Sequence, residues 1–219
     1  MDEHDAQHDF QSHQSHGADE NKAFFLRFVG FCHFEGEDYT GRRAAQWGEI
    51  TGVEKSAQVD NLCRMSIERS LLAAQGYIEL EMPVEALAEL DALGAEHQDC
   101  EEVLQLRLFV VMRGRLWEPA LAVCARLRSI YPDSSTGFIH GAFCLHEIGR
   151  TAEAKEVLLA GPSSLSQEAT YHYNLGCYDV VLGNRDEAQA HLRTSFELDK
   201  KFREIAKYDP DLKSVSDLF

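Results

Sequence analysis

Four residues have the types and the spacing that could perform chemistry: His140, Cys144, His146 and His172. His140 and Cys144 are four positions apart, so on a helix their side chains would project from the same face. Imidazole and thiolate groups placed together can bind a metal ion, or can act as a nucleophile and its base. One hypothesis is therefore a metal- or thiol-dependent accessory enzyme that uses these four residues.

The same residues also fit a non-catalytic role. Cysteine is a small apolar side chain that packs well between helices. A reactive thiolate needs an electropositive setting, which 37 acidic against 21 basic residues do not indicate. The motifs GxGxxG, HExxH, GxSxG and the phosphate-binding GxxxxGK loop do not occur. We therefore expect no enzymatic activity, no catalytic residue, no cofactor and no metal ligand set.

The charge of the chain narrows the class of partner. A net charge of −16 opposes binding to nucleic acid phosphates or to anionic lipid. A protein or peptide partner with amphipathic or basic character fits better.

The six cysteines include no CxxC pair, which predicts reduced thiols and a cytoplasmic location. The apolar run Phe24–Phe34 is shorter than the roughly 20 residues that span a membrane, so no membrane span is expected.

An alanine recurs at a fixed interval along the chain. Each copy lies 34 positions after the one before it, and each is followed four positions later by leucine or cysteine. Because the interval is kept three times in succession, it indicates a structural repeat rather than a coincidence. The repeated alanines are Ala86, Ala120, Ala154 and Ala188.

This pattern resembles the tetratricopeptide repeat (TPR), a helix-turn-helix unit of about 34 residues. The resemblance implies an all-α, right-handed solenoid of about four repeats with a C-terminal capping helix. It also implies a small residue where the two helices of a unit cross, twelve positions before each repeated alanine. Gly176 occupies that position in the last unit, which accounts for a glycine that otherwise costs a helix about 1 kcal/mol. The equivalent positions hold Ala74, Leu108 and Ala142, and Leu108 departs from the pattern.

The chain is also similar to small bacterial TPR proteins of unassigned function. The repeat defines the expected organisation of the chain. Residues 1–22 are polar, acidic and rich in histidine, and they are expected to be disordered. Residues 23–66 form an N-terminal extension with two open interpretations. Either residues 1–64 lack folded structure and translation starts at Met65, or Phe24–Phe34 caps the solenoid. The four TPR units are expected at 67–100, 101–134, 135–168 and 169–202, with a capping segment at 203–219.

Two local sequence signals agree with the expected helix starts, and one residue is assigned to the outer surface. Pro83 fits the first turn of the second helix in unit one. Asn184 and Glu187 are spaced like a capping box at the start of the last second helix. Lys155 is expected on the convex face, where its replacement by alanine should not measurably weaken a ligand bound in the groove.

In the TPR family the first helix of each unit lines a concave groove, and the resemblance transfers this role to particular residues. They give an apolar, partly aromatic surface that suits an amphipathic helix or an extended apolar segment. The expected function is therefore a non-catalytic interaction scaffold or chaperone-like adaptor. The alternative for this surface is that the chain's own terminal segment or a second copy covers it, giving a homo-oligomer through the groove or the C-terminal helix. The predicted groove residues are Leu71, Gln75, Ile78, Gln105, Phe109, Met112, Arg113, Ile139, Phe143, His146, Tyr173, Cys177 and Val180, with Phe109, Phe143 and Tyr173 expected to form an aromatic stripe.

Overall fold

The computed structural model describes residues 56–218, and side chains within 67–215. Across residues 56–218 the secondary structure consists of helices and turns, with no strand. The predicted disordered tail and the run Phe24–Phe34 lie outside the described residues. The first described helix already begins at Ser56, so the hypothesis that residues 1–64 lack folded structure is wrong for 56–64. None of the described helices combines the length and the apolar character that crossing a bilayer requires.

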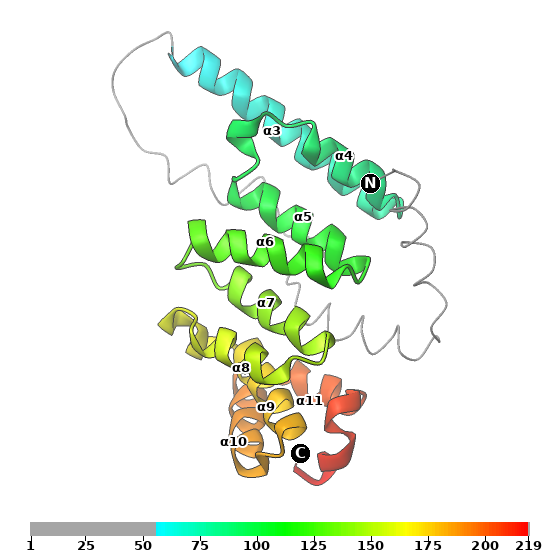
Figure 1. The fold of residues 1–219 in the computed structure, drawn as a ribbon, viewed down its shortest axis with the longest axis vertical. Coiled ribbons are helices and arrows are strands. Elements are labelled where there is room, and N and C mark those ends of the chain that lie inside the picture. The colour runs from blue at the N-terminus through cyan, green and yellow to red at the C-terminus, as the bar shows by residue number, and fades with distance from the viewer. Residues whose placement is uncertain (1–55, 219) are drawn as a thin grey trace. The chain divides into compact units, whose positions relative to one another are not determined.

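The described chain divides into two compact bodies, one ending at Gln98 and the other beginning at Asp99. The first contains α3 (Ser56–Glu79), α4 (Pro83–Asp91) and the short 3-10 helix η2 (Ala95–His97) (Figure 1). Pro83 is at the start of α4, as predicted. Its fixed φ suits a first helical turn, and its missing N–H would have no partner there.

The second body contains three more helix pairs and the C-terminal helices (Figure 1). Each pair lies within one of the predicted units two to four, and a 3-10 helix joins the third pair of the chain to the fourth. The elements are α5 (Glu101–Arg113), α6 (Trp117–Ile130), α7 (Thr136–Glu147), α8 (Thr151–Leu159), η3 (Ser163–Gln167), α9 (Ala169–Leu182), α10 (Arg185–Leu198), α11 (Lys201–Ala206) and η4 (Pro210–Leu218).

The turn between the two helices of a pair has the same backbone geometry in all four units. One residue in each turn has a positive φ, and these residues are 34 positions apart: Glu81 (58°), Arg115 (55°), Gly149 (79°) and Gly183 (83°). The next N–H in each case bonds back to the carbonyl five residues earlier, as Asn184 N–H does to Asp179 O at 2.8 Å. This is the Schellman arrangement that ends many helices. The repeat that the alanines indicate is therefore also a repeat of backbone conformation.

Gly176 marks the close crossing of α9 and α10. A Cβ added to Gly176 would lie 2.7 Å from Leu192 Cγ, which is too close for two carbon atoms. Leu192 and Ala188 of α10 are both buried, as is Ala142 at the equivalent crossing in unit three. The interpretation of Gly176 as a packing glycine is confirmed. Leu108 is also buried at its position in α5.

Helices α6 of unit two and α7 of unit three also pack closely against each other. A Cβ on Gly137 would lie 2.9 Å from Cys124 O, and one on Gly141 would lie 3.3 Å from Cys124 Cβ. The Arg128 side chain extends over this contact and donates a hydrogen bond to Gly137 O at 2.9 Å. The two glycines of α7 therefore let α6 pack against the backbone of the next unit.

The capping-box prediction is wrong in its details. Asn184 does precede α10, but its side chain makes no cap bond. Its amide instead donates to Asp179 Oδ1 at 2.9 Å. The asparagine therefore binds back to the preceding helix, because the tight turn brings it next to that buried carboxylate.

We predict that Gly176→Ala destabilises the protein by roughly 1 kcal/mol. The methyl group must displace the buried Leu192, and this overpacking exceeds the gain in helix propensity. Gly76→Ala in α3 is the matched control, because nothing lies within 4 Å of its added Cβ, and it should be neutral or stabilising. Urea denaturation followed by circular dichroism measures both. Equal midpoints for the two variants would contradict the assigned crossing.

A second prediction concerns the turns. Glu81→Gly should raise stability by roughly 0.5 to 1 kcal/mol, because glycine adopts a positive φ without the steric cost that a side chain incurs. Gly149→Ala should lower stability by a similar amount, since its added Cβ meets no neighbour and only the backbone conformation is penalised. Thermal denaturation of the two variants gives the signs. Stabilisation by Gly149→Ala would show that the turn is not left-handed in solution.

Candidate functional site

The inner face of α9 is covered by the C-terminal segment, which we define as residues 208–215. Tyr173 and Cys177 are predicted groove residues, and each is only 1% exposed. The C-terminal segment runs alongside α9 (Figure 1), and its Leu212 and Val215 are buried in the same core cluster. Part of the predicted groove is therefore occupied by the chain itself.

Asp209 is the polar centre of this contact. Its carboxylate is 1% exposed and accepts a hydrogen bond from Tyr173 Oη at 2.8 Å. Cys177 Sγ lies 3.8 Å from the same Oδ2 atom. The Asp211 N–H donates to Asp209 Oδ1 at 3.1 Å, which closes a turn around Pro210. A buried carboxylate is costly without such donors, so these bonds fix where the segment binds.

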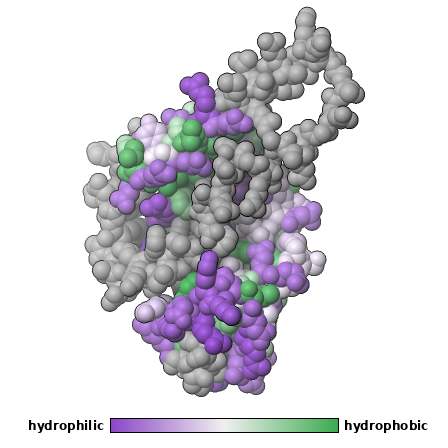
Figure 2. Space-filling view, turned by 180° about the vertical axis from the view of Figure 1, so that it is seen from behind, coloured by the Kyte–Doolittle hydropathy of each residue, from purple (hydrophilic) through white to green (hydrophobic). Residues whose placement is uncertain are grey.

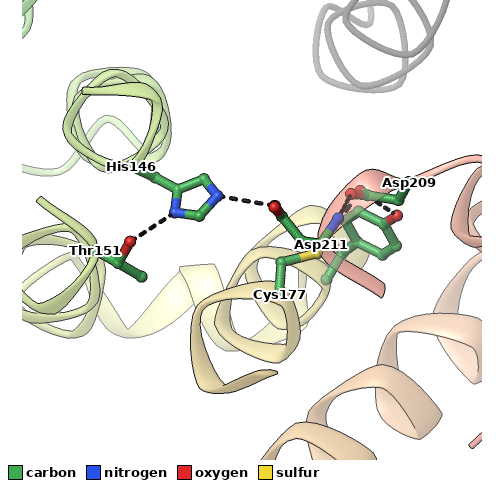
Figure 3. A network of polar contacts seen from close by, with 6 residues as sticks. His146, Thr151, Cys177, Asp209 and Asp211 are labelled. Atoms are coloured by element: carbon green, nitrogen blue, oxygen red, sulfur yellow. Dashed lines mark hydrogen bonds and ion pairs between the residues drawn. The ribbon is translucent and has the colours of Figure 1, made fainter. Parts of the chain in front are cut away.

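His146 links α7 and α8 to the same segment (Figure 3). Its Nε2 lies 2.8 Å from Asp211 Oδ2, and its Nδ1 lies 3.0 Å from Thr151 Oγ1. A carboxylate can only accept, so Nε2–H donates to Asp211 and, in the neutral ring, Nδ1 accepts from the Thr151 hydroxyl. The ring also packs on Tyr178, with centroids 4.9 Å apart. The C-terminal segment is thus bonded to first helices of two successive units.

The other predicted groove residues of the second body differ in accessibility. Phe143 is buried, and its ring packs edge-on against Trp117 with centroids 6.0 Å apart. Arg113 is exposed, and its guanidinium lies 5.8 Å above the half-buried ring of Phe109. The expected aromatic stripe is therefore accessible at Phe109 but buried at Phe143 and Tyr173. Of the remaining positions, Met112 and Ile139 are buried, whereas Gln105 and Val180 are half-buried, and in the first body so are Leu71, Gln75 and Ile78.

The four residues of the enzyme hypothesis do not share one set of contacts. Cys144 is hydrogen-bonded to Cys124, and this bond together with burial raises the pKa of its thiol. Burial lowers the pKa of His140 to about 4. His172 Nδ1 lies 3.2 Å from His191 Nδ1, and His146 contacts the C-terminal segment. A nucleophilic cysteine needs a lowered pKa, so this arrangement does not support a thiol enzyme at Cys144.

Lys155, the residue expected on the convex face, forms an ion pair with the next unit, and the prediction that its loss leaves groove binding unchanged stays a prediction. Its Nζ lies 2.5 Å from Oδ1 of Asp179, whose side chain is fully buried. The sequence could not show this, because the two residues belong to different units and meet only when α8 packs against α9.

Of the known proteins compared with this chain, only solved structures match it. No protein-family model matches the sequence, and no curated protein matches it significantly. Solved structures do match. A MamA fragment from Desulfovibrio magneticus RS-1 has a TM-score of 0.56 at 17% identity, covering 72% of this chain and 90% of that one. A thermophilic TPR protein from Thermus thermophilus has a TM-score of 0.56 at 20% identity, covering 68% and 82%.

A further crystal structure of MamA has a TM-score of 0.55 at 14% identity, covering 71% of this chain and 99% of that one. Identities this low show the fold alone. Together with the all-helical described region, they confirm the predicted all-α TPR fold.

We predict that Tyr173→Phe lowers stability by roughly 1 to 3 kcal/mol, because the buried Asp209 carboxylate loses a hydroxyl donor. Tyr171→Phe is the control, since it removes a hydroxyl from the same helix but keeps the edge-on contact with His172. Thermal denaturation compares the two. If Tyr173→Phe melts like Tyr171→Phe, the hydrogen bond to Asp209 does not hold the segment.

Proposed function

We propose that this chain is a non-catalytic scaffold that binds a protein or peptide partner on the first helices of its TPR units. The supporting observation is that the C-terminal segment already occupies this surface on α9. It is held there by hydrogen bonds to Asp209 and by burial of Leu212. A surface that holds a segment of its own chain in this way has the polar and apolar features that peptide recognition needs.

The proposed partner surface lies on α5, in the same body as the region that the C-terminal segment covers. Phe109 supplies an apolar ring, Arg113 an exposed cation, and Gln105 an amide that bonds to Glu101 at 3.1 Å. On the face shown in Figure 2, hydrophobic residues form small areas separated by hydrophilic ones. An aromatic anchor within a polar surface is typical of sites that bind short segments.

The proposed partner is an amphipathic helix or extended segment with apolar residues against Phe109. The net charge of −16 favours basic residues at its edges. Chaperone-like activity, self-association and cytoplasmic location stay predictions.

The site of binding can be tested by photo-crosslinking. A crosslinking phenylalanine analogue at position 109 of the full chain should capture a protein in the native cell. The same analogue at the exposed Leu159 of α8 is the control and should not capture it. Capture from position 159 but not from 109 would place the partner elsewhere.

The captured partner then allows a quantitative prediction. Phe109→Ala should weaken its binding by roughly 1 to 3 kcal/mol in calorimetry, as truncation of an aromatic anchor does. Leu159→Ala should leave the affinity unchanged. If Phe109→Ala binds as tightly as the parent, the first-helix surface of α5 is not the binding site.

A further inference from the structure

A cluster of potential metal ligands lies where the C-terminal segment meets α9. The donor atoms of Cys177, Asp209 and Asp211 all lie within 4.8 Å of one another. His146 Nε2 adds a nitrogen 2.8 Å from Asp211 Oδ2. Figure 3 shows the Cys177 side chain directed at the turn that carries the two aspartates, with His146 on its other side. We propose that these four residues form a zinc-binding site that fastens the C-terminal segment to α7 and α9.

The spacing of Cys177 Sγ and Asp209 Oδ2 is close to that of two ligands on a tetrahedral zinc ion, whereas His146 Nε2 lies outside the group of donor atoms that are all within 4.8 Å of one another. With Zn–S near 2.3 Å and Zn–O near 2.0 Å, a sulfur and an oxygen on the same ion are about 3.5 Å apart. Cys177 Sγ and Asp209 Oδ2 are 3.8 Å apart. Binding of zinc would therefore require side-chain rotations that draw the thiolate and the carboxylates together and that lengthen the 2.8 Å contact between His146 Nε2 and Asp211 Oδ2 to about 3.3 Å.

His146 is oriented in the way that zinc-binding histidines are. Its Nδ1 is held by Thr151 Oγ1 at 3.0 Å, and both side chains are buried. A second group that bonds the far ring nitrogen fixes the direction of the coordinating nitrogen. When zinc binds, Nε2 loses its proton and Nδ1–H donates to the Thr151 hydroxyl, which can accept as well as donate. Asp211 then turns from hydrogen-bond acceptor to ligand.

The chemistry of the donors favours zinc over magnesium and calcium. A thiolate and an imidazole disfavour magnesium and calcium, which bind oxygen ligands. The mixed set of sulfur, nitrogen and oxygen suits zinc in a structural role. Two carboxylates and a thiolate together carry three negative charges, which a doubly charged ion largely offsets. The bound ion would therefore strengthen the attachment of the C-terminal segment.

The test uses full-length protein in which His4, His8, His13 and His16 are replaced by alanine, because these histidines could bind metal independently. After treatment with chelator, cobalt is added as a spectroscopic probe and zinc is titrated by calorimetry. We expect one zinc per chain and a thiolate-to-cobalt charge-transfer absorption. Zinc should also slow tryptic cleavage at the exposed Lys213.

Cys177→Ser and Asp211→Asn should each weaken zinc binding by about tenfold or more. Cys177→Ser should in addition abolish the cobalt absorption. Cys100→Ser changes a thiol outside the cluster, so it is the matched control and should keep both. Far-UV circular dichroism shows that each variant is folded. The proposal is overturned if the folded parent binds no zinc, if both variants bind it as the parent does, or if Cys144→Ser rather than Cys177→Ser removes the cobalt absorption.

Discussion

The structure depends on the close crossing of the two helices in each unit, closed by the same left-handed turn every 34 residues. At Gly176 the backbone of α9 lies so near Leu192 that a single methyl group would not fit without movement. The turn at Gly183 then reverses the chain within a few residues and keeps α10 against α9. Because this geometry recurs, the same positions of each first helix carry the residues that a partner, or another part of the chain, can contact.

In unit four, the C-terminal segment of the same chain contacts these positions of the first helix, α9. The buried carboxylate of Asp209 needs donors, and Tyr173 supplies one from the inner face of α9. The same turn brings Asp211 to His146, so a few residues of the C-terminal segment bond to two units. This attachment separates the predicted groove into a covered part on α9 and the accessible Phe109 and Arg113 on α5. The proposed zinc ion would act at the boundary, on the residues that hold the cover in place.

The sequence predicted the fold because its determinants are local and periodic. The glycine at the crossing and Pro83 at a helix start are each visible within one unit, and the alanine recurs at the same position of every unit. The contacts that hold the C-terminal segment over the candidate site are instead long-range in sequence. Asp209 and Tyr173 are 36 positions apart, and His146 and Asp211 are 65 apart, so no periodic signal connects them. The pairing of Lys155 with Asp179 was missed for the same reason, since it arises only from the packing of two units.

In solution, as in the structure, the C-terminal segment should cover part of the first-helix surface. Amide hydrogen exchange measures this directly, because the Leu212 N–H bonds to Asp209 O at 3.2 Å and the Asp211 N–H to the Asp209 side chain. We predict that both amides exchange far more slowly than in an unstructured peptide, with protection approaching that of α9. Exchange at the unstructured rate, while α9 stays protected, would contradict the account and leave Tyr173 and Cys177 open to a partner.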